Sequence, residues 1–188
     1  TEKIVALLKT VAPKIAIVLG GPEVSYEQQE QPIVQMADHT ISGWGESSFY
    51  SLVCGILDTS ADRTSVSKLI SGKQEKLYKI QMPYYLYDQE GLMKRIMYVE
   101  ASRGCPYKCE FCLSSLDKTA WSFDIERFLS EMALLHARGA RQFKFVDRTF
   151  NLKVDSSIRI LEFFLERLDE DLFLHFEVIP DHLPDRLK

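Results

Sequence analysis

The sequence lacks long apolar runs, a surplus of basic residues and a large number of cysteines. It contains no stretch of about 18 consecutive apolar residues, and no charged segment followed by an apolar one and a small-residue cleavage site. Its 27 acidic and 23 basic residues give a formal net charge of -4, and no basic block is long enough to follow a phosphate backbone. We therefore expect a cytoplasmic protein, with neither a membrane nor a nucleic acid as its partner.

The four cysteines are too few and too closely grouped for a disulfide framework. Three of them fall between positions 105 and 112, where they cannot link distant parts of a secreted fold. The chain otherwise has the composition of a folded globular protein, with 46% hydrophobic residues and a mean hydropathy of -0.12. The grouping of the cysteines indicates a metal centre.

The first 58 residues alternate between predicted helices and strands, in the order typical of a parallel sheet covered by helices. The apolar run 15–19 and the shorter run 39–41 each lead into a glycine-rich turn. Ligands bind at this edge of open α/β sheets, because the loops and helix N-termini there offer free backbone N–H groups. The next helix is expected to face the sheet with an apolar stripe of Phe49, Leu52, Val53, Ile56 and Leu57.

Residues 59–97 interrupt this alternation with Ser, Lys, Gln and Gly and predict a connector between domains. Its tyrosines at positions 84, 85 and 87 are expected to pack the connector onto a neighbour, and the alternative is that they line a substrate entrance. The alternation then resumes with strands over 96–101, 142–146 and 172–178.

Two helices are predicted between these strands. One covers 124–138 and is stopped by Gly139, and the other begins at Asp155. The apolar face expected for the second helix consists of Ile158, Leu161, Leu165 and Leu168. Right-handed crossovers would place the three strands side by side in parallel. The expected fold class is therefore α/β, a partial doubly wound unit followed by the first half of a (βα) partial barrel.

The cysteines at 105, 109 and 112 follow the pattern C-x3-C-x2-C directly after a predicted strand. Electron-transfer ferredoxins supply four cysteines to a cluster, whereas three cysteines leave one iron of a [4Fe-4S] cluster open to another ligand. Cys105, Cys109 and Cys112 are therefore the predicted metal ligands. An open iron indicates chemistry rather than electron storage.

The string SRGCPYKCEFC resembles the cluster motif of the radical S-adenosylmethionine (SAM) superfamily, including the aromatic Phe111 before the last cysteine. The resemblance implies that SAM binds the open iron and is cleaved reductively to a 5'-deoxyadenosyl radical. That radical would serve methylation, cyclisation or rearrangement of an unknown, small-molecule substrate. The family also implies a reductant such as flavodoxin or ferredoxin.

A non-catalytic zinc-binding α/β module is the alternative interpretation of the cysteines. Zinc in a structural site would need a fourth ligand, for which the sequence offers Cys54, His39, His136, His175 and His182. None of these residues lies in a paired C-x2-4-C position, so the spacing favours the iron–sulfur cluster.

Further SAM contacts are implied by the resemblance. The segment Asp147-Arg148-Thr149-Phe150 is similar to the Asp-Asp-x-Phe element of cobalamin-linked radical SAM proteins, where the family contacts the SAM amino group. Arg148 departs from the second acidic residue of that element. Phe111, Asp147, Thr149 and Glu177 are the predicted SAM-binding residues, although Asp147 could equally form a polar turn that caps the next helix. Glu177 is expected to be a buried carboxylate on the third strand, which favours a ligand role.

The amino-terminal glycine turns resemble ligand loops of the cobalamin-binding domain that precedes many radical SAM domains. The residues that carry this resemblance are Gly20, Gly21, Gly43, Gly45 and Glu46. Relatives in this subgroup include methylating enzymes and the anaerobic magnesium-protoporphyrin IX monomethyl ester cyclase. The implied domains are the C-terminal part of a cobalamin-binding-like domain (1–58), a connector (59–97) and the N-terminal half of a radical SAM domain (98–188).

We expect the chain to be a fragment of a longer protein, because it starts without Met at Thr1 and stops at Lys188, soon after a predicted helix start near Asp181. Radical SAM barrels generally have six βα units, and three are predicted here. The fragment alone is expected to be inactive and either to self-associate through an unpaired strand edge or to leave its cysteine loop disordered.

Overall fold

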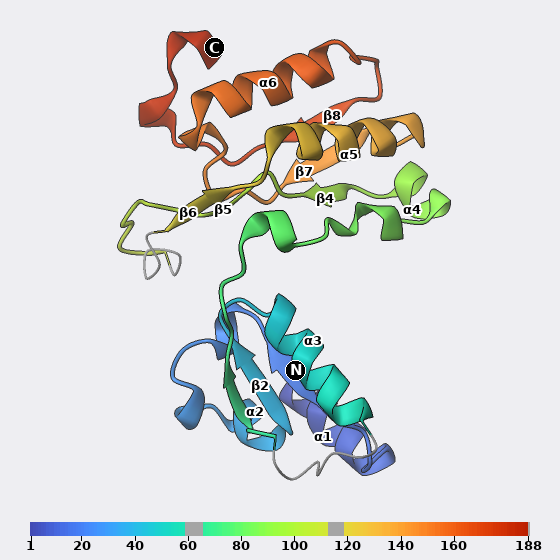
Figure 1. The fold of residues 1–188 in the computed structure, drawn as a ribbon, viewed down its shortest axis with the longest axis vertical. Helices are drawn as coiled ribbons and strands as arrows, with labels where there is room; N and C mark the ends of the chain where they lie inside the picture. Colours follow the sequence, from blue (N-terminus) through green and yellow to red (C-terminus); the bar gives the residue numbers. More distant parts are fainter. Residues whose placement is uncertain (59–65, 113–118, 188) are drawn as a thin grey trace. The chain divides into compact units, whose positions relative to one another are not determined.

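The computed structural model describes residues 1–58, 66–112 and 119–187, which form two compact units, Thr1–Ile80 and Gln81–Lys188 (Figure 1). Each unit contains a three-stranded parallel sheet, and the second unit also contains a two-stranded antiparallel hairpin. The predicted α/β class with parallel sheets is confirmed. No helix in the described ranges is long and apolar enough to span a membrane.

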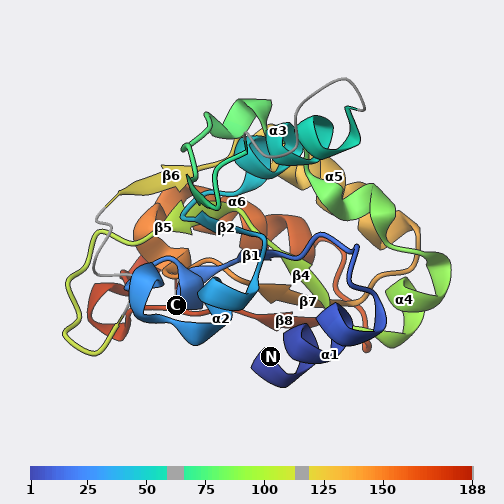
Figure 2. The same ribbon diagram turned by 90° about the horizontal axis from the view of Figure 1, so that it is seen from below.

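The first unit follows the predicted alternation of helices and strands. Its elements are α1 (Glu2–Val11), β1 (Val18–Gly20), α2 (Pro32–Met36), β2 (His39–Ser42), α3 (Glu46–Leu57) and β3 (Leu69–Ser71). The strand order is β1-β2-β3. Helices α1 and α2 pack against each other (Figure 2), and their buried core includes Val5, Ile17 and Ala37. Because β1 and β2 pair in parallel, their carboxyl ends lie side by side. A glycine turn follows each strand.

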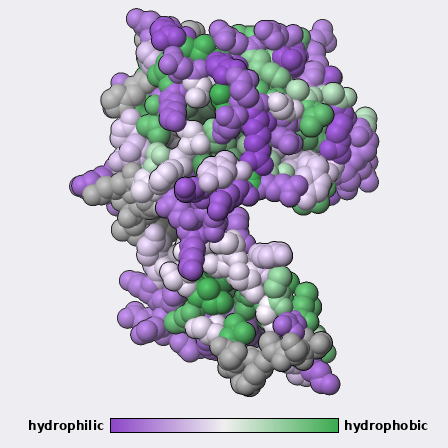
Figure 3. All heavy atoms as spheres, in the orientation of Figure 1, coloured by the Kyte–Doolittle hydropathy of each residue, from purple (hydrophilic) through white to green (hydrophobic). Residues whose placement is uncertain are grey.

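Helix α3 buries only part of its predicted stripe. Leu52 is buried, whereas Phe49 and Leu57 have exposed fractions of 50% and 71%. Hydrophobic side chains consequently remain on the surface over α3 (Figure 3). The stripe spans more of the helix circumference than one sheet face can cover, so its outer positions stay accessible.

Residues of the predicted connector take part in both units. β3 pairs in parallel with β2, with Ile70 opposite Ile41, and so completes the first sheet. Tyr84, from the same predicted connector, is buried in the second unit with 5% of its surface exposed.

The second unit contains the cysteine segment and the predicted half barrel. Its elements are α4 (Gln89–Lys94), β4 (Met97–Val99), β5 (Ser102–Gly104), β6 (Ala120–Ser122), α5 (Ile125–Ala137), β7 (Gln142–Phe145), α6 (Val154–Leu165) and β8 (Phe173–His175). Strands β4, β7 and β8 are parallel and adjacent in that order, as the crossover rule predicted. Helix α5 has the predicted ends, because the Asp124 side chain accepts a hydrogen bond from the Arg127 N–H and Gly139 has a φ of 100°.

Helices α5 and α6 lie beside the sheet of β4, β7 and β8 (Figure 1), and phenylalanine rings join both helices to one face of it. Phe143 and Phe145 alternate along β7 and are fully buried. The Phe145 ring lies 5.8 Å from that of Phe128 in α5, and the Phe143 ring lies 5.0 Å from that of Phe164 in α6. The tilted ring arrangements add to the free energy gained from burial alone.

The predicted apolar face of α6 is wrong. The helix buries Ser157, Ile160, Phe163 and Phe164, whereas Leu165 is 65% exposed. Aromatic rings remove more apolar surface from water than leucines do, so this stripe faces the sheet. The predicted leucine stripe instead lines a groove of about 360 Å³ beside β8 and Leu187.

Truncation of Phe145 should destabilise the second unit strongly. Its ring also contacts those of Phe150 and Phe176, at 5.5 and 4.6 Å, so Phe145→Ala would leave a cavity at the centre of the cluster. We expect the free energy of unfolding to fall by about 3–5 kcal/mol in urea titrations. The matched Phe173→Ala change, at a ring that is 49% exposed, should cost much less. Equal losses in the two variants would contradict this packing.

Candidate functional site

The cysteine segment lies on the connection between the antiparallel strands β5 and β6. The sequence predicted a strand, a loop and then a helix, and the structure inserts this hairpin before α5. Cys105 follows β5 directly and is half-buried, Cys109 is exposed, and Cys112 is half-buried with its N–H donating to the Cys109 carbonyl at 3.0 Å. None of the three is joined in a disulfide in the described part of the chain.

Gly104 is required where the hairpin closes. Its φ of 83° is unfavourable for other residues, and an added Cβ would lie 2.0 Å from the carbonyl oxygen of Thr119. The glycine that precedes the first cysteine of the motif is therefore required for a steric reason. It allows the strand that follows the loop to approach the strand that precedes it.

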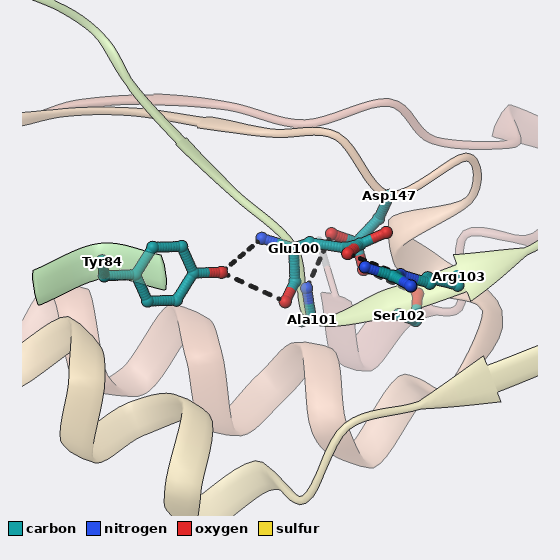
Figure 4. Close-up of polar contacts among 6 residues, drawn as sticks. All are labelled: Tyr84, Glu100, Ala101, Ser102, Arg103 and Asp147. Carbon is teal, nitrogen blue, oxygen red and sulfur yellow. Dashed lines mark hydrogen bonds and ion pairs between the residues drawn. The ribbon is translucent and has the colours of Figure 1, made fainter. Parts of the chain in front are cut away.

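Asp147 fixes the backbone that leads into the hairpin (Figure 4). It lies just after β7, is 1% exposed, and accepts hydrogen bonds from the Ala101 N–H at 3.0 Å and the Ser102 hydroxyl at 2.6 Å. Burial raises the pKa of Asp147, while the hydrogen bonds from Ser102 and Ala101 act in the opposite direction. The carboxylate thus bridges two segments of the site and does not cap the next helix, which corrects the alternative drawn from the sequence.

Thr149 brings a second side chain from the same turn to the cysteine segment. It is 3% exposed, and its hydroxyl oxygen lies 3.4 Å from the Sγ of Cys105. Two residues predicted to contact SAM, Asp147 and Thr149, therefore lie at the base of the cysteine loop. Their interactions in this structure are with the protein itself.

Sequence reasoning missed a second set of contacts around Glu100. The buried Tyr84 hydroxyl accepts a hydrogen bond from the Glu100 N–H at 2.9 Å and lies 3.4 Å from the Glu100 carbonyl (Figure 4). Burial raises the pKa of Tyr84, so the phenol stays neutral. The Glu100 carboxylate also pairs with Arg103 at 2.8 Å. The only feature of the sequence that could have indicated these contacts was the unusual density of tyrosines in the predicted connector.

Glu177 is not the buried strand residue that was expected. β8 ends at His175, and Glu177 is exposed beyond it. Its backbone carbonyl accepts a hydrogen bond from the Phe150 N–H at 2.8 Å, which fixes the chain there. Because the Glu177 carboxylate is exposed to water, it needs no ligand to offset a cost of burial. Phe111 is also accessible, with 94% of its surface exposed.

The chemistry of the cysteine segment fits an iron–sulfur cluster, although the thiols are not gathered around one point. Within the described ranges, which include all three cysteines, no three His, Cys, Asp or Glu side chains lie close enough to share a metal ion. The described structure thus supplies no complete zinc site. Three reduced thiols on one short connection are the donor set that a cluster with one open iron requires.

The glycine turns of the first unit are joined by a residue that the sequence analysis did not single out. The Ser25 hydroxyl donates to the Gly21 carbonyl at 2.7 Å and accepts from the Gly43 N–H at 3.0 Å. Gly21 and Gly43 have φ values of 103° and 69°. Gly20 is the last residue of β1, Gly45 immediately precedes α3, and Glu46 begins that helix. A third glycine, Gly72, packs so closely on the Trp44 carbonyl that a Cβ would lie 1.9 Å from it.

The raised pKa of Asp147 should appear in the pH dependence of stability. The folded chain retains the Asp147 proton from the ordinary pKa of 3.8 up to the raised pKa, whereas the unfolded chain loses it. The free energy of unfolding therefore falls as pH rises through that interval. Asp147→Asn cannot ionise, so in urea titrations the wild type should lose stability relative to this variant as pH rises above the ordinary pKa of 3.8. Parallel pH profiles would contradict the assignment.

Comparison with known proteins gives relatives at the level of sequence, while no protein-family model matches the chain. An uncharacterized methyltransferase of Pyrococcus horikoshii is 29% identical over 182 residues, which cover 82% of this chain and 39% of the relative. The cobalamin-dependent radical SAM methyltransferase TokK of Streptomyces tokunonensis is 27% identical over 156 residues, covering 69% and 22%. The chain therefore spans well under half the length of these relatives.

Solved structures show the same fold. The radical SAM methyltransferase TsrM of Kitasatospora setae, with tryptophan substrate and a SAM analogue bound, matches 99% of this chain with a TM-score of 0.69 at 15% identity. TsrM with cobalamin and a [4Fe-4S] cluster bound gives a TM-score of 0.68. The chain covers 41% of each TsrM chain. The resemblance predicted from the cysteine motif is confirmed at the level of sequence, because TokK, to which this chain is similar, is a cobalamin-dependent radical SAM methyltransferase.

Proposed function

We propose that this chain carries the cluster-binding part of a cobalamin-dependent radical SAM methyltransferase. The observation that supports this most strongly is the set of three cysteine thiols on one connection at the carboxyl edge of a parallel sheet. Active sites of (βα) barrels form at that edge. Methyl transfer is the outcome that the named relatives share.

Cys105, Cys109 and Cys112 would hold a [4Fe-4S] cluster. When bound, such a cluster with SAM on its open iron supplies the single electron that cleaves SAM. The protein's task is to hold the thiolates and exclude competing ligands. Because metal binding is coupled to ordering of the ligands, the exposed part of the loop can gather its thiols while the base stays fixed by Asp147.

The aromatic and acidic residues near the cysteines have proposed roles toward SAM. Phe111 precedes Cys112 and is almost fully exposed, so its ring is available to pack on a bound ligand. Glu177 is exposed at the same sheet edge and is available to accept hydrogen bonds. Asp147 and Thr149 are already engaged at the loop base, which supports a role in positioning the cysteines.

The first unit is proposed to bind cobalamin at its two glycine turns. These turns follow adjacent parallel strands, and their positive φ values bring backbone rather than side chains to the edge. Gly20, Gly21, Gly43, Gly45 and Glu46 would be the contacting residues. The Ser25 bridge holds the turns in register.

The substrate is proposed to be a small molecule, and the electron donor a flavodoxin or ferredoxin. The sheet face opposite α5 and α6 carries Tyr98, Lys144 and His175 at one register across β4, β7 and β8. Tyr98 and His175 are exposed. This polar row supports that face as the side that meets the substrate.

Cluster assembly should depend on three cysteines and no others. After anaerobic reconstitution with iron and sulfide, the wild type should bind about four irons per chain. Ala substitution of Cys105, Cys109 or Cys112 should abolish the brown absorbance and the bound iron. The control is Cys54→Ala, because Cys54 lies on α3 in the other unit. This variant should bind iron normally.

Two results would contradict the proposed cluster. One tightly bound zinc with no iron uptake would favour the non-catalytic zinc module. Loss of the cluster in Cys54→Ala to the same extent as in Cys105→Ala would overturn the three-ligand assignment.

Cobalamin binding is tested separately by titrating the chain with hydroxocobalamin and following the cobalamin absorbance. Gly43→Val should weaken binding at least tenfold, because a branched side chain strains the positive φ and occupies the space at the edge. Gly55→Ala, at an open position of α3, should bind as the wild type does. Equal affinities in the two variants would refute the cobalamin site.

A further inference from the structure

We propose that the Thr149 hydroxyl donates a hydrogen bond to the Sγ of Cys105 when that sulfur ligates the cluster, and that it raises the reduction potential of the cluster. The inference rests on the proposed function, because it requires a cluster on Cys105. It gives Thr149 a role that differs from the SAM contact implied by the family resemblance. Thr149 would be a positioning and tuning residue.

The direction of the hydrogen bond follows from the chemistry of the two groups. In the free protein the oxygen and sulfur atoms lie 3.4 Å apart, and either could be the donor. A thiolate bound to iron has no proton to give, whereas the threonine hydroxyl retains one. Binding of the cluster therefore leaves the hydroxyl as the only possible donor of this pair.

Thr149 is held firmly on both sides. Before it, Asp147 is bonded to Ala101 and Ser102. After it, the Phe150 N–H donates to the Glu177 carbonyl at 2.8 Å, and the Phe150 carbonyl accepts from the Ser157 hydroxyl at 2.7 Å. Retreat of the backbone at Thr149 would require several of these bonds to break, and burial of the Thr149 side chain, which is 3% exposed, limits its rotation. The donor is thus preorganised.

Asn151 extends the same anchored segment. Its amide nitrogen donates to the Ile179 carbonyl at 2.8 Å, and its amide oxygen accepts from the Ile179 N–H at 2.9 Å. Asn151 is 3% exposed, so this reciprocal pair is protected from water. The turn after β7 is therefore a fixed platform beside Cys105.

Cys105 is the cysteine best placed to respond to a fixed donor. It follows Gly104, which pairs with Ala120 in the hairpin, whereas Cys109 lies on the exposed part of the connection. The Cys105 sulfur is therefore attached to a more constrained backbone than that of Cys109. A hydrogen bond at this position would persist through reduction of the cluster.

The sign of the effect follows from charge. Reduction adds negative charge to the cluster and its sulfur ligands, and a donor dipole directed at a ligand sulfur stabilises that charge more than the oxidised state. Hydrogen bonds to the sulfurs are among the protein's main means of setting cluster potentials. Low exposure of Thr149 strengthens the interaction, because water does not screen it.

The test compares midpoint potentials of reconstituted proteins without SAM, measured by redox titration with electron paramagnetic resonance. Thr149→Val keeps the branched shape and removes the hydroxyl, so its potential should be more negative than that of the wild type. Thr149→Ser retains a hydroxyl and should restore the potential most of the way. Thr40→Val makes the same change at a residue that is 0% exposed in the other unit, and its potential should not move.

The measured potentials and iron contents support or overturn the role of Thr149. A Thr149→Val protein with full iron content and the wild-type potential would overturn the inference alone. If the wild type takes up no iron, the proposed function fails and the inference fails with it. Thr149→Ala is a second hydroxyl-free variant and should show the same negative shift. Loss of cluster assembly in both hydroxyl-free variants, with assembly kept in Thr149→Ser, would replace the tuning role by a purely structural one.

Discussion

The site depends on one buried carboxylate. Asp147 leaves the end of β7 and accepts hydrogen bonds from the backbone of Ala101 and the side chain of Ser102, which lie where β4 gives way to the hairpin. The phenylalanine cluster packed against β7 fixes the strand that precedes Asp147. The Asp147 carboxylate, whose burial costs free energy unless it is hydrogen-bonded, thus joins the sheet to the loop that carries the cysteines.

This arrangement divides the cysteine loop into a fixed base and an adaptable tip. Gly104, Asp147 and Thr149 define the position of Cys105, whereas Cys109 and Phe111 are exposed. Metal binding is coupled to ordering of the ligands, so an adaptable tip can close on a cluster while a fixed base keeps one ligand in place. The chain supplies both, and the free energy of metal binding would order the remainder of the loop.

Local signals predicted much of the fold, and contacts distant in sequence were missed. The cysteine spacing, the alternation of helices and strands, and the ends of α5 at Asp124 and Gly139 each depend on a few adjacent residues. The bond between Asp147 and Ala101 joins residues 46 positions apart, and no local pattern encodes it. The prediction of the buried face of α6 was wrong because that helix has two apolar stripes, and only packing against the sheet decides which of them is buried. Glu177 was misplaced because β8 ends two residues before it.

The central claim is that three cysteines hold a cluster whose fourth iron is open to SAM. Mössbauer spectroscopy of the chain reconstituted with ⁵⁷Fe, recorded with and without SAM, tests it most directly. The account predicts that SAM changes the spectrum of one iron in about four and leaves the others unchanged. Four irons that remain alike in the presence of SAM, or the absence of a cluster from the wild-type chain, would contradict it.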